Sequence, residues 1–380
     1  MARLGDVVKI EVSSKSVVGD SFWLLNLDMV EQQTGNVIDY NYVGKDALNG
    51  SIIQFDTGCV LYSKLRPNLN KVVIPNQDGF ATSEMLPLRP NTKMLTREYL
   101  TAFLRSDSFV TWAVSKTAGA KMPRLGSKEL LGKEIPLPSI SEQTRIAEQF
   151  DKIDELITLR KEQLAKLDQL VKSRFIELFG DPVVNPKSWE TAPLSALIIN
   201  ANNGMARRGK DEDGNIVLRL VELQNGFIDY SAPNRICLNE IEKKRYELVD
   251  NDFLFARVNG NPDYVGRCAV FKSISEPVFH NDHIIRVHFD DTKLNGCFTS
   301  VLLNSDYGKR QMREQIKTSA GQYTISQDGI GAIMAILPPM ELQKQFAIFV
   351  EQTDKSKLAI QQSLDKLELL KKSLMQEYFG

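Results

Sequence analysis

The residues of this chain that are best suited to chemistry are loop cations, amides and tyrosines, and they fall into two groups. The first group comprises Lys64, Arg66, Asn68, Asn70, Lys121 and Arg124. The second group comprises Arg207, Arg208, Lys210, Arg257, Asn259, Asn261, Tyr264, Gln322 and Tyr323. Arginine and lysine bind phosphates and guanine edges, and asparagine and glutamine bind adenine edges. A solvated surface explains any single cluster equally well, but their recurrence in both halves of the chain indicates nucleic-acid-binding loops.

The segment from Gly204 to Lys210 has the spacing of a phosphate-binding loop, G-x-x-x-x-G-K. The next residue is Asp211, whereas such a loop needs a serine or threonine there to hold Mg²⁺. The residues that follow read as a turn and a strand, so no helix N-terminus is expected to face a phosphate. We therefore predict no nucleotide site in this segment.

The tetrapeptide Asn261-Pro262-Asp263-Tyr264 resembles the N-P-P-Y motif by which amino-methyltransferases hold a flipped base. Its third residue is aspartate, and the chain has no glycine-rich strand–turn–helix segment suited to S-adenosylmethionine. A turn between two neighbouring strands is the favoured interpretation.

The remaining reactive residue types do not assemble into a catalytic motif. The three histidines, His280, His283 and His288, fit alternation along a strand better than the three or four ligands of a metal site. The pair Glu242 and Lys244 lacks the Pro-Asp that a nuclease motif would place before it. The sequence therefore predicts a chain that is not an enzyme and that binds no metal or cofactor itself.

Composition sets further bounds on the class of protein. The 380 residues, 42% hydrophobic and 25% charged, predict two globular domains with buried cores plus helical segments. The formal net charge of −1 excludes a basic field over the whole protein, so nucleic-acid contacts must come from local patches or from partner chains. Four cysteines without a C-x-x-C pair are typical of free thiols. No secretory leader or membrane-spanning run is evident, which predicts a cytoplasmic protein with no membrane partner.

The loops must be positioned by a long element that the chain contains twice. The stretches at 135–180 and 335–380 align without a gap at an offset of 200 residues, so that Pro138 meets Pro338 and Gln143 meets Gln343. Each copy has a proline bend followed by a stripe of apolar residues at helical spacing. Ser139 or Ser141 is the expected N-cap of the first helix, and Gly180 is its expected end. The first stripe comprises Ile146, Phe150, Ile153, Ile157, Leu164, Leu167, Leu170 or Val171, and Leu178. The second comprises Phe346, Val350, Leu358, Leu364, Leu367 and Leu370 or Leu374, and it has a polar gap at 352–357.

Each predicted helix has an apolar seam and no partner within its own half, and isolated helices are marginally stable. We therefore expect the two helices to pack on each other in antiparallel fashion, which gives the molecule an approximate two-fold repeat. The predicted fold class is α+β: two similar mixed α/β domains separated by a pair of long coiled-coil helices. The expected boundaries are 1–134 for the first domain, 135–180 for the first helix, 181–334 for the second domain with its linker, and 335–380 for the second helix.

Within the domains, turn residues separate short β-rich runs, and one helix follows them. The first domain is predicted to have strands at 51–55, 59–62 and 71–74 and a helix at 96–114. The second is predicted to have strands at 216–220, 252–257, 268–272 and 283–289 and a helix at 295–316.

Three motifs mark the starts of the two long stretches and the linker between the halves: I-P-L-P-S-I-S-E-Q at 135–143, F-G-D-P-V-V-N-P-K-S-W at 179–189 and L-P-P-M-E-L-Q at 337–343. With these motifs, the whole chain resembles the specificity (S) subunit of type I restriction–modification enzymes. Ser139 stands where the family often has a second proline, and Leu342 stands where the first copy has Glu142. These departures bear only on the exact ends of the helices.

The resemblance implies a non-catalytic reader of double-stranded DNA. Each domain would be a target-recognition domain for one half of a split sequence, and the helix pair would set the gap. Two methyltransferase subunits would dock and bring S-adenosylmethionine, and restriction subunits would bring ATP, Mg²⁺ and the nuclease. Two alternatives stay open: the specificity subunit of a type II system with a fused methyltransferase–nuclease partner, and a helical adaptor that binds no DNA.

Overall fold

The computed structural model describes residues 1–14, 19–48, 50–119, 121–319 and 321–380. The chain divides into two compact units. Unit 1 is formed by Met1–Gln163 together with Ile360–Gly380, and unit 2 is formed by Leu164–Ala359. Each unit therefore contains a portion of both long helices. In the described part of the chain, no helix is long and apolar enough to cross a membrane.

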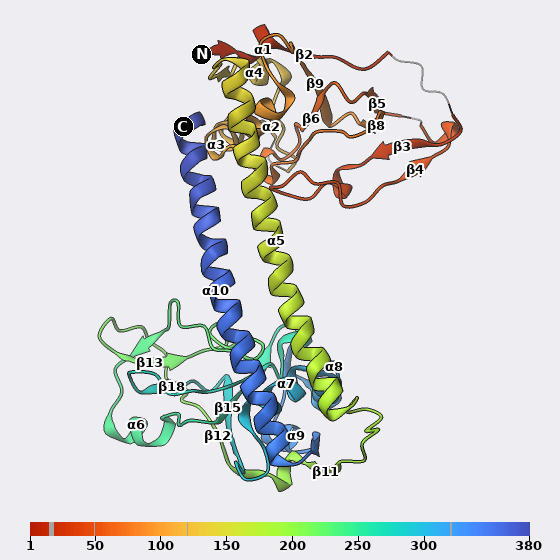
Figure 1. The fold of residues 1–380 in the computed structure, drawn as a ribbon. Coiled ribbons are helices and arrows are strands. Elements are labelled where there is room, and N and C mark those ends of the chain that lie inside the picture. The colour runs from red at the N-terminus through yellow and green to blue at the C-terminus, as the bar shows by residue number, and fades with distance from the viewer. Residues whose placement is uncertain (15–18, 49, 120, 320) are drawn as a thin grey trace. The chain divides into compact units, whose positions relative to one another are not determined.

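Unit 1 is built on two four-stranded sheets (Figure 1). The first has the order β2-β9-β6-β7 and is antiparallel, and the second has the order β4-β3-β8-β5, in which β3 and β8 are parallel. Its strands are β1 (Ala2–Arg3), β2 (Val8–Ile10), β3 (Phe22–Leu25), β4 (Tyr42–Val43), β5 (Ile52–Phe55), β6 (Val60–Ser63), β7 (Val72–Val73), β8 (Gly79–Thr82), β9 (Met85–Pro90) and β10 (Glu134–Ile135). The three strands predicted for this unit are confirmed as β5, β6 and β7, with ends shifted by at most one residue.

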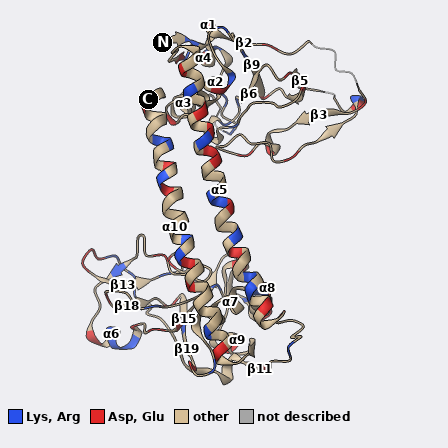
Figure 2. Cartoon of the chain, viewed as in Figure 1, with Lys and Arg blue, Asp and Glu red and all other residues tan. Residues whose placement is uncertain are grey.

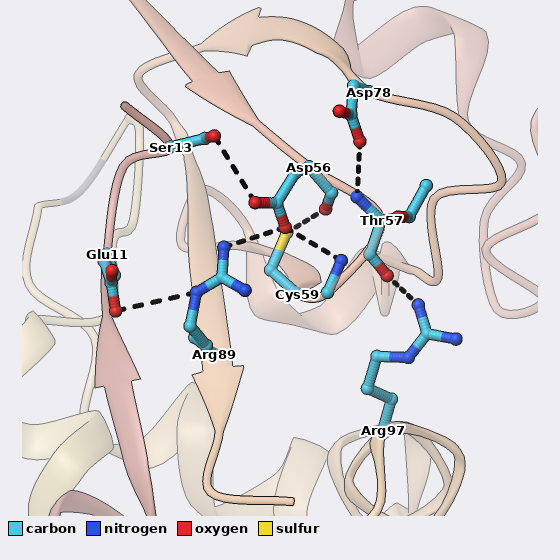
Figure 3. Close-up of polar contacts among 9 residues, drawn as sticks. Glu11, Ser13, Asp56, Thr57, Cys59, Asp78, Arg89 and Arg97 are labelled. Atoms are coloured by element: carbon cyan, nitrogen blue, oxygen red, sulfur yellow. Dashed lines mark hydrogen bonds and ion pairs between the residues drawn. The ribbon is translucent and has the colours of Figure 1, made fainter. Parts of the chain in front are cut away.

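A buried carboxylate fixes the turn that leads into β6 (Figure 3). The Asp56 side chain accepts hydrogen bonds from Arg89 Nη2 on β9 and from the Gly58 N–H, both at 2.8 Å. Arg97, at the start of the following helix, donates to the Thr57 carbonyl in the same turn. Because Asp56 is 4% exposed, its charge requires such partners, and together they anchor the N-terminal end of β6.

Unit 2 repeats the first sheet of unit 1. Its four-stranded sheet has the order β12-β19-β15-β17, and a second sheet, β14-β13-β18, again contains one parallel pair, β13 with β18. Its strands are β11 (Glu190–Pro193), β12 (Ile198–Asn203), β13 (Asn215–Leu218), β14 (Arg235–Ile236), β15 (Asp252–Ala256), β16 (Val258–Asn259), β17 (Cys268–Val270), β18 (Val278–His280), β19 (Ile284–Phe289), β20 (Lys317–Ser319), β21 (Gln322–Thr324) and β22 (Met334–Leu337). The strands predicted here are confirmed as β13, β15, β17 and β19.

The prediction of one helix after the strands of each unit is wrong in one respect, because the structure has two consecutive helices there. The helices are α1 (Leu4–Val7), α2 (Arg97–Arg105), α3 (Asp107–Ser115), α4 (Ser127–Gly132), α5 (Ile140–Phe179), α6 (Glu240–Tyr246), α7 (Gly296–Asn304), α8 (Asp306–Gln315), α9 (Gln327–Gly331) and α10 (Met340–Phe379). Ser106 has an extended backbone and its Oγ accepts from the Phe109 N–H at 3.3 Å, so it caps a new helix. Ser305 does the same for α8. Apolar periodicity continues across both breaks, which is why it did not reveal them.

The two long helices are confirmed. Ser139 caps α5 through a 3.3 Å hydrogen bond from the Glu142 N–H to its Oγ, and Gly180 follows the last turn with φ +79°. The polar segment at 352–357 lies within α10 and does not interrupt it. Figure 2 shows Lys and Arg interspersed with Asp and Glu along both helices.

Within each unit, the portions of α5 and α10 that it contains run antiparallel. In unit 1, Lys371 lies 2.5 Å from Asp154, and in unit 2, Lys357 lies 2.6 Å from Asp168. The predicted seam is correct for most of its length, but Leu358 is 61% exposed and its placement in the seam was wrong. Thr353, 5% exposed, lies in the buried seam there, and Lys357 reaches across to the neighbouring helix instead.

A buried glutamine joins each long helix to the sheet-bearing part of its unit. In unit 1, Gln143 Oε1 accepts from the Thr96 N–H at 3.0 Å, and its Nε2 donates to the Met94 and Pro138 carbonyls. In unit 2, Gln343 makes the equivalent three bonds, to the Asn295 N–H and to the Lys293 and Pro338 carbonyls. Both glutamines are 0% exposed, so each set of bonds replaces water completely.

The last residue of each long helix completes a core. Phe379 packs against Tyr99, Phe103 and Phe150 in unit 1. Phe179 packs in the same way against Phe175, Phe298 and Phe346 in unit 2. Each unit is therefore completed by the helix that began in the other.

Candidate nucleic-acid interface

The structure brings together the two predicted loop clusters of unit 1. The Arg66 N–H donates to the Pro123 carbonyl at 2.8 Å, and the Leu125 N–H donates to the Lys64 carbonyl at 2.9 Å. A backbone bridge between Leu65 and Arg124 continues the contact. The segments at 64–70 and 121–125 therefore form one surface at the C-terminal end of β6.

The side chains of this surface differ in their freedom. Arg66, Asn68 and Lys121 are exposed, and Lys64 is half-buried. Asn70 is 7% exposed, and its amide donates to the Arg105 carbonyl at the end of α2 at 3.0 Å. Asn70 thus holds the loop onto α2, and its side chain is turned away from solvent.

Arg124 is held by a carboxylate that the sequence did not reveal. Its Nε lies 3.1 Å from both carboxylate oxygens of Glu84, and its Nη2 lies 2.9 Å from Oε1. This pairing lowers the pKa of Glu84 from its usual value, chiefly through the hydrogen bonds from Arg124. The guanidinium is therefore fixed in orientation although its side chain is 42% exposed.

In unit 2, the three predicted clusters meet around the segment at 282–283. The Arg257 N–H donates to the His283 carbonyl at 2.8 Å, and its Nη1 donates to the Asp282 carbonyl at 3.1 Å. Arg208 Nη2 lies 2.7 Å from Asp282 Oδ1 and 3.1 Å from His283 Nε2. The Ile325 N–H donates to the Arg257 carbonyl at 2.9 Å, which draws in β21.

The other predicted residues of unit 2 surround this centre. Arg207 is paired with Glu242 on α6 at 3.4 Å, and Lys210 is exposed in the same loop. Asn259 lies on β16 opposite Tyr323 on β21, beside Gln322.

Asn261 and Tyr264 lie in the turn that follows β16. Asn261 caps it with its side chain, as the turn interpretation of Asn261–Tyr264 predicted. The Tyr264 ring is covered by the Arg267 guanidinium, 4.5 Å from its centroid.

Lys64 and Arg257 occupy equivalent positions in the two units. Each follows the third strand of the four-stranded sheet, which is β6 or β15. The Lys64 N–H donates to the carbonyl of Glu84, just before β9, and the Arg257 N–H donates to the carbonyl of His283, just before β19. The Lys64 carbonyl accepts from the Leu125 N–H, and the Arg257 carbonyl accepts from the Ile325 N–H. Leu125 and Ile325 are 200 residues apart in the sequence. The two loop surfaces are therefore the same site built twice.

One further arginine of unit 2, which a buried glutamate holds in place, was not predicted from the sequence. Arg219 follows β13, and its Nη2 and Nε lie 2.6 and 3.2 Å from Oε1 of Glu222, which is 3% exposed. The Asn281 N–H donates to the Leu218 carbonyl at 3.0 Å, so Arg219 lies beside the segment at 282–283. The spacing of Arg and Glu three residues apart was visible, but only the turn after β13 makes them face each other.

The histidines and cysteines have structural surroundings. Burial lowers the pKa of His280 to about 4, and His288 Nδ1 lies 3.0 Å from Asp252, which is 0% exposed. Burial raises the pKa of the Cys59 and Cys297 thiols to about 11, so both are protonated at neutral pH. No group of three or more His, Cys, Asp and Glu side chains suited to a metal ion occurs within the described ranges.

Comparison with known proteins gives consistent matches. Residues 2–169 match the family described as the type I restriction modification DNA specificity domain. Over 309 residues the chain is 28% identical to the type I restriction enzyme StySPI specificity subunit of Salmonella potsdam, which covers 77% of this chain and 66% of that subunit. The match thus spans slightly less than two thirds of the relative's length.

Two solved structures share the fold. The type I restriction–modification system S subunit from M. genitalium covers 100% of this chain and 95% of its own, with a TM-score of 0.59 and 14% identity. A chain from a structural study of complex assembly in the type I R-M system covers 100% and 96%, with a TM-score of 0.61 and 16% identity. The predicted α+β fold class is thereby confirmed.

Proposed function

We propose that this chain is the sequence-reading subunit of a type I restriction–modification complex, because its residues 2–169 match the DNA specificity domain of such systems and most of the chain aligns with a specificity subunit. In this proposal each unit reads one half of a bipartite double-stranded DNA target through the loop surface at the end of β6 or β15. The chain itself performs no catalysis.

The observation that carries the proposal is the repetition of the loop surface. Lys64 and Arg257 have the same backbone hydrogen bonds in two different sequence contexts. A reader of a split target needs two surfaces of one design, whereas the side chains on them must differ in order to select different bases.

The charge of the surface also fits a subunit of a larger complex. Arg124, Arg207 and Arg208 are each paired with a carboxylate, and the formal net charge is −1. Phosphate contacts dominate affinity for DNA, so a near-neutral reader needs partners that supply more of them. We assign this role to two methyltransferase subunits, which bring S-adenosylmethionine, and to restriction subunits, which bring ATP and Mg²⁺.

Methylation mapping by long-read sequencing tests the proposal. A host that carries the gene with its neighbouring partner genes is compared with the same host from which only this gene is deleted. Loss of one bipartite adenine-methylation motif with a fixed gap is the expected result. An unchanged set of motifs would overturn the DNA function and leave the helical adaptor.

A further inference from the structure

We propose that Arg124 and Arg219 are the guanine-reading residues of the two units, and that Glu84 and Glu222 position them for this task. The inference rests on the proposed DNA-reading function and adds to it the chemistry of one base pair in each half-site. Arg219 is not part of any motif in the sequence, and neither glutamate is a cation or amide that would contact DNA itself.

The geometry of the Arg124 pair leaves one edge of the guanidinium free. A guanidinium has five N–H donors. Glu84 occupies the Nε–H and one Nη2–H, and the Met122 carbonyl lies 3.3 Å from Nη1. Glu84 therefore takes the side-on edge, and no carboxylate of the described residues takes the end-on edge, which consists of one N–H on Nη1 and one on Nη2 side by side. This is the pair of parallel donors that matches O6 and N7 of guanine in the major groove.

The Arg219 pair has the same design with a more firmly held carboxylate. Glu222 takes the Nε–H and one Nη2–H, and it also accepts from the Arg219 backbone N–H at 2.8 Å. No hydrogen bond joins Nη1 to any of the residues that the structure describes. Because Glu222 is 3% exposed, its charge cannot be solvated if Arg219 leaves, so the guanidinium stays in place.

Other arginines provide the contrast. Arg235 binds Glu276 through Nη1 at 2.8 Å and Nη2 at 2.7 Å, so the edge that would face a base is already used. Arg145 binds Glu142 side-on but lies on α5, and its Nη2 also reaches Tyr378. Among the arginines that the structure describes, only Arg124, in the loop surface of unit 1, and Arg219, beside the segment at 282–283 of unit 2, combine the side-on pair with such a place.

The test is the methylation motif of four single variants in the assembled complex, with Arg235→Lys as the matched control. Lysine keeps the positive charge but cannot offer two coplanar donors. R124K is expected to relax one G·C position in one half-site, R219K one G·C position in the other, and R235K none. The lost preference should be roughly 5- to 150-fold, which corresponds to one bidentate base contact. Glu84→Gln should relax the same position as R124K, and Glu84→Asp, which keeps the carboxylate, should retain it.

In each variant the unaltered half-site reports that the complex is folded. Binding to DNA with 7-deazaguanine, which lacks the N7 acceptor, at the relaxed position supplies a second readout. Wild-type complex should lose affinity for this DNA, and R124K should bind it as it binds guanine.

If R124K and R219K retain the full motif, the two arginines are phosphate contacts or structural, and the inference is overturned while the proposed function stands. If the wild-type chain directs no motif at all, the proposed function itself fails.

Discussion

Units 1 and 2 use the same frame to hold different surfaces. Both have a four-stranded sheet of one strand order, a buried glutamine that binds the start of a helix, and a phenylalanine that closes the core. Outside this frame they diverge. Unit 1 places β5 beside β8, whereas unit 2 has α6 and a separate small sheet, β16-β21-β20. The loops can thus vary while the frame stays constant.

The buried charges of the two units show how far this freedom extends. In unit 1, Asp56 precedes β6 and is neutralised by Arg89 on the central strand, β9. In unit 2, Asp252 begins β15 and meets His288 and Arg286 on the central strand, β19, at 3.0 and 3.6 Å. Each unit thus places a buried carboxylate near the start of the third strand, but its exact position and the cation that balances it differ.

The largest expected effect comes from lengthening both long helices, which tests whether these helices set the gap between the two half-sites. Inserting four residues after Lys161 and four after Gln361 adds about 6 Å of helix at ~1.5 Å per residue. The mapped gap between half-sites is expected to grow by roughly two base pairs of ~3.4 Å each. Both half-site sequences should stay as they were, and a gap of unchanged length would contradict the spacer role.

Removing Phe179 and Phe379, the last residues of α5 and α10, tests whether each unit depends on the end of the helix that begins in the other unit. Phe179→Ala should destabilise unit 2, and Phe379→Ala unit 1, by about 3–5 kcal/mol each, because a large buried ring is lost. Hydrogen exchange resolved by segment should show faster opening in one unit only. Leu358→Ala is the control, because that side chain is 61% exposed and its loss should change stability by less than about 0.5 kcal/mol. Equal opening of both units by either variant would refute the symmetry.

Low pH should destabilise unit 2 more than unit 1, because all three histidines lie in unit 2. Burial lowers the pKa of His280 from 6.5 to about 4, so between these values the unfolded chain binds a proton that the folded unit does not. Unit 2 should therefore lose stability as pH falls from about 6.5 to 4, by about 3 kcal/mol in total.

Denaturant unfolding followed by segment-resolved hydrogen exchange at several pH values measures this loss. His280→Gln should remove it from unit 2, whereas His283→Gln should keep it. A pH slope that persists in His280→Gln would assign the effect to other groups.

The smallest expected effects come from the equivalent loop residues. Lys64→Ala and Arg257→Ala should each weaken DNA binding by the assembled complex by about 1–3 kcal/mol if they contact bases. Titration of cognate and half-mutated DNA at several salt concentrations should attribute each loss to one half-site. Lys355→Ala, on α10 and 73% exposed, is the control. Unchanged affinity for both loop variants would remove them from the interface.

The elements that repeat were the most predictable part of the fold. The 200-residue register and the cap residues, Ser139 or Ser141 and Gly180, predicted the ends of α5 within two residues, because caps and helical periodicity are local signals. The expected bounds of 135–180 began five residues early, since they included the proline bend. The breaks at Ser106 and Ser305 were missed, since the apolar pattern continues across them. In the loops, residue type predicted which cations gather after the strands. The partners that orient them, Glu84 for Arg124 and Asp282 for Arg208, come from strands and turns far along the chain, and no local pattern identifies them.

The division of each unit between distant parts of the chain has a consequence during protein synthesis. The Ser108 hydroxyl donates to the Phe379 carbonyl at 2.7 Å, across 271 positions of sequence. Unit 2 is translated in between, which takes about 10–40 s at ~5–20 residues per second. Throughout that interval Tyr99, Phe103 and Phe150 lack the ring that covers them, and the nascent chain presents an apolar face to chaperones. The domain that leaves the ribosome first is the last to be completed.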